Sequence, residues 1–283
     1  MRQIKPTSHI FLFECPDQKG LTTAITGLFL KNDLNILSAF EYVDCQSQRF
    51  FLRLEAEGDM DRESLFNECH KLFPRDYWIH FPTNEPKKII VLGSTQPYCF
   101  GDLALRCLYK EIFAEIAAFM SDHVDLEPLA QKFDKPFYYI PVESSDQSDH
   151  EAAIEQVIDN YQPDYVVLAK YNRLLSHEFV SRYPNKIINV NHSFLPTSAH
   201  LQSYKEAYQR GIKLIGATAH FVTDDINNGP IITQSALAIP HAANEEDLKR
   251  VGHNIEKACL AEALQIVCED RIFVHNNRTV ICE

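Results

Sequence analysis

The chain has 283 residues, 45% of them hydrophobic, which is enough to build the cores of about two domains. Acidic residues outnumber basic ones, with 39 Asp and Glu against 27 Lys and Arg, and the formal net charge is -12. Such a charge provides no basic field for a phosphate backbone, so we expect no nucleic-acid partner. The eight cysteines show no C-x-x-C pair and no zinc-like spacing, which predicts reduced thiols and no structural metal.

The sequence also shows no membrane-directed segment. Residues 1–6 lack the apolar core of a signal peptide. No apolar run approaches the roughly 20 residues that a membrane-spanning helix needs. We therefore expect a cytoplasmic protein without a membrane partner.

The first part of the chain predicts a small α+β domain over residues 1–83. Residues 9–14 alternate like a strand, and turn residues at 15–20 lead into apolar residues at helical spacing up to Lys31. The elements that follow are predicted strands at 35–43 and 49–55, a helix at 65–72 and a strand at 78–81. This order is that of a ferredoxin-like unit, and it ends in a polar linker at 82–86.

From residue 87 onward the pattern changes to buried strands that alternate with helices. Strands are predicted at 89–93, 114–120, 137–140, 165–169, 187–190, 217–222 and 231–237. Helices are predicted at 102–109, 151–161, 178–182 and 245–268, and a hairpin around 274–278. Strands without polar alternation are covered on both faces, so residues 84–283 are predicted to form a doubly wound, Rossmann-like α/β domain.

The usual phosphate-binding motifs are not found in this second domain. The segment Gly93–Pro97 follows the first strand but lacks the G-x-G-x-x-G spacing of a dinucleotide site. No Gly-Lys-Ser/Thr sequence occurs either, which argues against a P-loop. We therefore expect no dinucleotide cofactor.

The stretch Asn189–Pro230 is the candidate functional site. It opens with polar residues at the end of a buried strand, and ligands of open α/β sheets bind outside the carboxyl ends of the strands. Taken singly, Asn189 would be a strand-end amide and Asp224 a residue that caps a turn. Only the surrounding motif makes them candidates for chemistry.

The segment Cys15–Leu21, followed by a predicted helix and then Asn35, resembles the start of an ACT domain. ACT domains are small amino-acid-sensing modules that often pair edge to edge. The resemblance leaves two roles open for this domain, namely binding of an amino-acid effector and a purely architectural or dimerising role. In either case we expect a homo-oligomer.

Over nearly its whole length the chain resembles formyltetrahydrofolate deformylase, in which an ACT domain precedes a formyltransferase-fold domain. The matching segments are residues 161–171, 186–196, 207–211, 216–220, 222–224 and 229–232. The resemblance implies hydrolysis of 10-formyltetrahydrofolate to formate and tetrahydrofolate, which supplies formate for purine biosynthesis and balances one-carbon metabolism. It implies that folate is the substrate and that no further cofactor or metal is needed.

The resemblance also implies roles for individual residues. Asn189 is the amide that stabilises the oxyanion formed on attack at the formyl carbon, and Asp224 is the carboxylate that raises the pKa of a catalytic imidazole. The residues implied to bind the substrate are Tyr171, Asn172, Leu174, His200 and Gly229.

Several positions around the predicted pocket depart from the family pattern, namely Asn191, the loop at residues 197–204, and Asn172, where the family often has Met. Members usually read Asn-x-His-His-Ser-Phe-Leu-Pro, whereas this chain has Asn191 where the catalytic His is expected, followed by His192. Asparagine cannot carry a proton, and losing general acid–base help typically costs about 10²- to 10⁴-fold in rate. We expect His192 to point away from the face of Asn191 if the strand continues, and His200 to be a solvated loop residue.

These changes leave three functions open. The first is deformylase activity, reduced by Asn191. The second is transfer of the formyl group to a small amine, and the third is an inactive regulator that binds folate or an amino acid.

Overall fold

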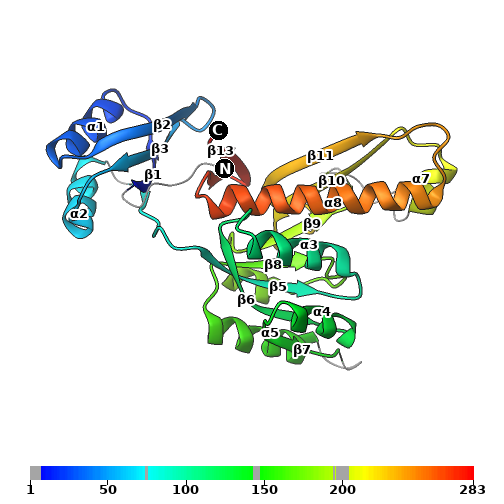
Figure 1. The fold of residues 1–283 in the computed structure, drawn as a ribbon. Coiled ribbons are helices and arrows are strands. Elements are labelled where there is room, and N and C mark those ends of the chain that lie inside the picture. Colours follow the sequence, from blue (N-terminus) through cyan, green and yellow to red (C-terminus); the bar gives the residue numbers. More distant parts are fainter. Residues whose placement is uncertain (1–7, 74–75, 143–146, 194, 196–203) are drawn as a thin grey trace. The chain divides into compact units, whose positions relative to one another are not determined.

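The computed structural model describes residues 8–73, 76–142, 147–193, 195 and 204–283. The chain divides into two compact units, Met1–Glu85 with Ile281–Glu283, and Pro86–Val280 (Figure 1). Among the described residues, no helix is long and apolar enough to cross a membrane.

The first unit is a four-stranded antiparallel sheet with two helices. Its elements are β1 (Ser8–Pro16), α1 (Leu21–Lys31), β2 (Asn35–Asp44), β3 (Arg49–Glu57), α2 (Arg62–Leu72) and β4 (Trp78–His80). The sheet order β2-β3-β1-β4 confirms the ferredoxin-like, ACT-type fold. Gly20 begins α1 with a φ of 91°, a conformation that suits glycine, and the Asp61 side chain caps α2 through the Ser64 backbone N–H.

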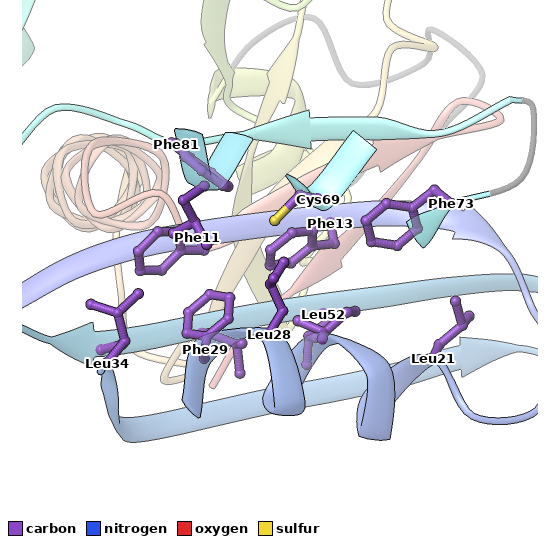
Figure 2. Close-up of a cluster of buried hydrophobic side chains, with 14 of the residues drawn as sticks. Phe11, Phe13, Leu21, Leu28, Phe29, Leu34, Leu52, Cys69, Phe73 and Phe81 are labelled. Carbon is purple, nitrogen blue, oxygen red and sulfur yellow. The ribbon is translucent and has the colours of Figure 1, made fainter. Parts of the chain in front are cut away.

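An aromatic cluster fills the core of this unit (Figure 2). Alternate residues of β1, Phe11 and Phe13, point from the sheet toward the helices. Phe11 packs edge-on against Phe29 of α1 and against Phe81, with ring centroids 4.7 Å and 4.8 Å apart. Phe13 stacks on Phe73 at 5.7 Å. The apolar alternation read from the sequence therefore specifies this core.

The second unit is built on a seven-stranded mixed sheet of order β11-β10-β9-β8-β5-β6-β7. Its strands are β5 (Lys87–Gly93), β6 (Ala114–Ser121), β7 (Phe137–Tyr139), β8 (Tyr165–Ala169), β9 (Ile187–Asn191), β10 (Leu214–Phe221) and β11 (Ile231–Ala238). The strands from β5 to β9 are parallel, which confirms the Rossmann-like prediction. The last two strands differ, because β10 runs antiparallel to both β9 and β11.

Helices cover both faces of this sheet. They are α3 (Pro97–Leu108), α4 (Glu127–Lys132), α5 (Gln147–Tyr161), α6 (His177–Arg182), α7 (Tyr204–Gln209) and α8 (Glu245–Cys268). Apolar residues of α5 and α6 pack against one face, on alternate strand residues such as Ile90 and Leu92. Phe100 of α3 stacks on Phe119 of β6 at 4.0 Å, and α3 packs against α8. A hairpin of β12 (Ile272–His275) and β13 (Arg278–Ile281) follows α8.

Several elements begin earlier than the sequence pattern indicates. The helix α3 starts at Pro97 and not at Asp102, because proline is well suited to the first turn, where its missing N–H is not needed. The short helices α4 and α7 are additions that the apolar pattern did not predict.

The long helix α8 begins at Glu245, as the sequence predicts, after a capping box in which Asn244 and Asp247 exchange side-chain and backbone hydrogen bonds.

Candidate active site

The end of β9 and the middle of β10 present one polar face. In the antiparallel pairing, Asn191 lies opposite Thr218 and Asn189 lies opposite His220. Side chains that face each other across a strand pair point to the same side of the sheet, so these four residues gather on one face. The carboxyl end of β9 therefore meets the interior of a neighbouring strand.

Asn189 is held by a buried histidine. Its Nδ2 lies 3.4 Å from Nε2 of His220, whose side chain is 3% exposed. The other ring nitrogen, Nδ1, is 2.9 Å from the carbonyl oxygen of Phe221, so Nδ1 carries the hydrogen and Nε2 accepts from the Asn189 amide. Burial lowers the pKa of His220, which keeps the ring neutral and suited to this accepting role.

Asn191 pairs with a second asparagine. Its Nδ2 donates to Oδ1 of Asn227 at 3.0 Å, and its Oδ1 accepts from the Ser193 hydroxyl at 2.9 Å. The residue that contacts position 191 from the loop after β10 is therefore a neutral carboxamide. Neither member of this pair can gain or lose a proton near neutral pH.

Asp224, the carboxylate implied by the resemblance, contacts another residue. Its Oδ2 lies 3.1 Å from Nδ1 of His177, at the start of α6, and both side chains are more than half exposed. The described contacts thus join Asp224 to a histidine, but to the first residue of α6 and not to position 191.

Two histidines, His192 and His200, follow position 191 in the sequence. The His192 ring centroid is 6.4 Å from that of Tyr204 at the start of α7, and His192 is exposed. His200 lies outside the described residues.

Hydrogen bonds fix the backbone that follows Asn191. The Thr218 hydroxyl donates to the carbonyl of Ser193 at 2.8 Å and accepts from the backbone N–H of Leu195 at 3.1 Å. Gln234 of β11 donates to the Leu195 carbonyl and to the Thr218 hydroxyl at 3.0 Å and 2.9 Å. The interior of the antiparallel strands therefore supports the segment that leaves β9.

Gly229 allows the loop after β10 to fold back closely. A side-chain Cβ at this position would lie 1.8 Å from the carbonyl oxygen of Phe221. The loop closes with a hydrogen bond from the Phe221 N–H to the Pro230 carbonyl. This close approach is a structural role of Gly229, whatever it contributes to substrate binding.

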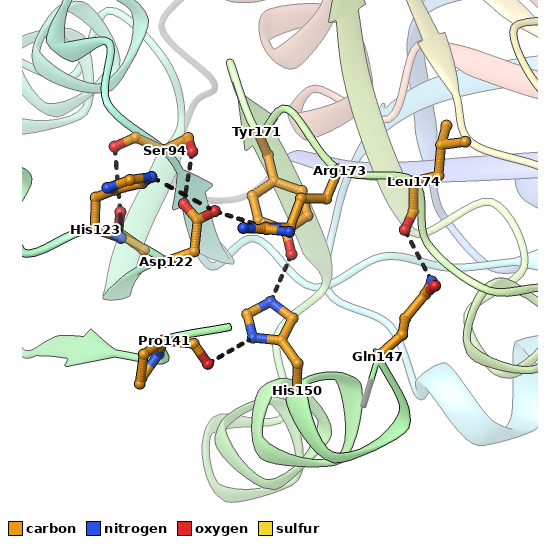
Figure 3. A network of polar contacts seen from close by, with 10 residues as sticks. Ser94, Asp122, His123, Pro141, Gln147, His150, Tyr171, Arg173 and Leu174 are labelled. Carbon is orange, nitrogen blue, oxygen red and sulfur yellow. Dashed lines mark hydrogen bonds and ion pairs between the residues drawn. The ribbon is translucent and has the colours of Figure 1, made fainter. Parts of the chain in front are cut away.

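A second polar network lies at the carboxyl ends of β5, β6 and β8 (Figure 3). Asp122, whose side chain is 2% exposed, accepts from the Ser94 hydroxyl at 2.6 Å and from Arg173 Nε at 2.8 Å. Since β8 and β6 flank β5 in the sheet, this is the place where the strand order reverses and where doubly wound proteins bind ligands. Arg173 thus brings a guanidinium, partly exposed, to that crevice.

Tyr171 is anchored in the same network. Its hydroxyl lies 2.6 Å from Nε2 of His150, and Nδ1 of His150 faces the Pro141 carbonyl at 3.4 Å (Figure 3). Burial lowers the pKa of His150, so a neutral ring accepts the tyrosine hydrogen. Asn172 and Leu174 follow on the exposed loop, where the Leu174 carbonyl accepts from Gln147 at 3.0 Å.

The sequence reading missed Asp122, Arg173 and His150. A signal existed for the first, because Ser121 and Asp122 are polar residues at the end of a buried strand. His150 had no such signal, since it lies in a helix and meets Tyr171 only through tertiary packing.

An open space lies beside the loop that carries Asn227. A cavity of about 350 Å³ is lined by loop residues 227–229, by Leu195 and Ile231, and by residues 277–279 of the C-terminal hairpin. Asn227 therefore borders both Asn191 and a space that small molecules can enter.

Known proteins resemble this chain over almost its full length. The family model for formyl transferase matches residues 87–264. A formyltetrahydrofolate deformylase of Haemophilus influenzae is 40% identical over 272 residues, covering 96% of this chain and 98% of that protein. The corresponding protein of Escherichia coli strain K12 is 42% identical over 267 residues, with 94% and 95% covered.

Solved structures extend the likeness to both units. The crystal structure of a formyltetrahydrofolate deformylase from Pseudomonas syringae pv. tomato superposes with a TM-score of 0.91 at 31% sequence identity. The superposition covers 99% of this chain and 96% of that one, so it includes the ACT-like unit as well as the formyltransferase domain. The chain therefore belongs to the formyltetrahydrofolate deformylase family.

Proposed function

We propose that this protein binds 10-formyltetrahydrofolate at the end of β9 and hydrolyses it slowly to formate and tetrahydrofolate. The relatives that match the whole chain carry the name of this activity. The observation that supports slow hydrolysis is the hydrogen bond between Asn191 and Asn227, at 3.0 Å. It provides hydrogen-bond donors and acceptors beside Asn189 but no group that transfers a proton.

The position of Asn189 supports one step of this hydrolysis, the stabilisation of the oxyanion. When water attacks the formyl carbon, the oxygen gains negative charge, which an oriented amide N–H of Asn189 stabilises. His220 accepts one N–H of that amide and leaves the second one to the substrate. The proton that leaves the attacking water has no acceptor in the Asn191–Asn227 pair, and for this reason we expect slow hydrolysis.

Formate release from 10-formyltetrahydrofolate by the purified full chain tests this proposal, with Asn191→His compared side by side. We expect slow release by the wild type and faster release by the variant, because an imidazole at position 191 restores a proton acceptor beside Asn189. Absence of turnover in the wild type with recovery in Asn191→His would refute slow hydrolysis and keep the site assignment.

The same assay separates the two other functions. A formylated amine in place of free formate would show transfer to an acceptor. Tight folate binding without hydrolysis or transfer, in both the wild type and Asn191→His, would show a regulator that binds without reacting.

For the ACT-like unit we propose self-association through the edge strand β2. This strand is ten residues long, lies at one end of the sheet, and exposes large side chains such as Leu37 and Tyr42. Among the described strands β2 pairs with β3 alone, and an edge strand of this length is a template for pairing with a second copy. An amino-acid effector is the further role that the ACT resemblance suggests for this unit.

Light scattering of the full chain checks this proposal, and we expect the mass of a dimer or a larger oligomer. Ala39→Lys places a charge on the exposed part of β2 and is expected to lower the mass at a given concentration. A monomeric mass for the wild type at working concentration would contradict self-association.

A further inference from the structure

A buried carboxylate lies outside the contacts described so far. Glu256, in the middle of α8, is 1% exposed. Its Oε2 accepts from the Tyr98 hydroxyl at 2.6 Å and pairs with Lys170 Nζ at 3.1 Å, while its Oε1 accepts from the Tyr204 hydroxyl at 2.8 Å. One side chain thus joins four segments of the second unit.

Glu256 is charged in spite of its burial. Burial by itself would raise the pKa of Glu256, but the charge of Lys170 and hydrogen bonds from Tyr98, Tyr204 and Lys170 hold the pKa below its usual value. A buried ion pair of this kind adds little net stability, because packed apolar residues of similar size often serve as well. Stability alone therefore does not account for a charge in this place.

Two of the three partners belong to segments that border the site. Lys170 directly precedes Tyr171 and the loop that carries Arg173, and it has a left-handed backbone with a φ of 63°. Tyr204 begins α7, and its ring is the one that faces His192, with centroids 6.4 Å apart. The contact with Glu256 holds both segments to the same point of α8.

The third partner is held differently. Tyr98 lies in the first turn of α3 and stacks on His253 of α8, with ring centroids 3.9 Å apart. Tyr98 follows the loop that carries Ser94, but its close stacking on His253 keeps its ring in place without its hydroxyl group, whereas the Tyr204 ring meets His253 edge-on at 6.1 Å.

The surface of α8 is shaped for Tyr204. Gly252 lies one turn before Glu256, and a Cβ at that position would be 2.1 Å from the Tyr204 hydroxyl oxygen. The absence of a side chain there allows Tyr204 to reach the carboxylate.

We propose that Glu256 is a positioning residue for the folate site, which holds the loop after β8 through Lys170 and the start of α7 through Tyr204. The inference rests on the proposed folate binding. Glu256 does not touch the substrate in this role, and it acts through the two segments that it holds.

Two matched substitutions test it, Tyr204→Phe and Tyr98→Phe. Each removes one hydroxyl donor to Glu256 and leaves the ring, the carboxylate and Lys170 in place. We expect Tyr204→Phe to weaken tetrahydrofolate binding about tenfold, the scale of one hydrogen bond to a charged group, because it frees a segment that borders the site. Tyr98→Phe is expected to leave the Kd within about twofold. Isothermal titration with tetrahydrofolate measures both.

Equal effects of the two substitutions on the Kd, or none in either, would show that the carboxylate serves only packing. The double variant Lys170→Met with Glu256→Leu provides a check that does not depend on Tyr204→Phe being stable. An apolar pair often replaces a buried ion pair at little cost, but this variant also removes the acceptor of the Tyr98 and Tyr204 hydroxyls, so we expect a moderately lower unfolding temperature together with weaker tetrahydrofolate binding. Unchanged binding by this variant would also overturn the inference.

A readout without ligand keeps this test separate from the proposed function. NMR signals of the His192 ring in the ligand-free protein are expected to shift in Tyr204→Phe and to stay in Tyr98→Phe. If the wild type binds no tetrahydrofolate, the proposed function fails, and the His192 signals still decide whether Glu256 positions this segment.

Discussion

Replacing Asn191 by His and Asn227 by Asp together should raise the rate of formate release about 10²- to 10⁴-fold above the wild type, the range of general acid–base catalysis. The two side chains are already in contact, at 3.0 Å, so the exchange places a carboxylate beside an imidazole without moving the backbone. A carboxylate at that distance raises the pKa of the imidazole and stabilises its protonated form. The assay is formate release from 10-formyltetrahydrofolate as a function of pH.

The single variants separate the two contributions. Asn191→His alone places the imidazole beside a neutral Asn227, so we expect a smaller increase and a lower kinetic pKa than in the double variant. Asn227→Asp alone supplies a charge without a ring and is expected to stay near the wild-type rate.

Asp224 provides the decisive comparison. If Asp224 supports the imidazole as the family resemblance implies, Asn191→His with Asp224→Asn should lose the gain of Asn191→His. If position 227 is the partner, that loss should not occur, because Asp224 contacts His177. If the double variant Asn191→His with Asn227→Asp releases formate no faster than Asn191→His alone, the assignment of position 227 as the partner of residue 191 is contradicted.

Replacing Gly229 by Ala should destabilise the second unit by about 3 kcal/mol or more, at the upper end of the cost of overpacking. The new Cβ would lie 1.8 Å from the Phe221 carbonyl oxygen and 3.0 Å from its carbonyl carbon, and Phe221 is held by its pairing with Ile188 of β9 and by its hydrogen bond to Pro230. Thermal or denaturant unfolding measures the loss. Because the same loop carries Asn227, we also expect its contact with Asn191 to be displaced.

Gly101 provides the matched control within the same unit. A Cβ there would meet only Leu129 Cδ2, at an ordinary contact distance of 3.5 Å, and the residue lies inside α3. Gly101→Ala is therefore expected to leave stability unchanged or to raise it by up to about 1 kcal/mol. Similar unfolding midpoints for both variants would contradict the steric role of Gly229.

The sequence predicted the elements that depend on apolar patterning. The buried strands from β5 to β9 and the aromatic core of the first unit follow from runs and alternations that need no tertiary information. The start of α3 was placed five residues late, at Asp102, because Pro97 and the residues after it carry a capping signal and not a periodic one. The direction of β10 could not be read, since strand periodicity is the same in both orientations.

The sequence predicted the site residues at the strand end but not the residues that contact them. Asn189 and Asn191 stand at a strand end, a position that a sequence shows directly. Their partners His220 and Asn227 come from the interior of an antiparallel strand and from a loop that folds back, so only the three-dimensional register joins them. Arg173 and Asp122 meet across different strands and share no sequence spacing.

The candidate site has two parts that differ in how firmly the sheet holds them: residues of the antiparallel strand β10, and a residue of the turn that follows it. Thr218 and His220 belong to a strand that is hydrogen-bonded on both sides, and they cannot shift without disturbing the sheet. Asn227 is carried by an exposed turn whose base is closed by the hydrogen bond between Phe221 and Pro230. Substitutions in this short turn can therefore change the charge presented to residue 191 while the scaffold is preserved, so related chains can gain or lose proton transfer through very few changes.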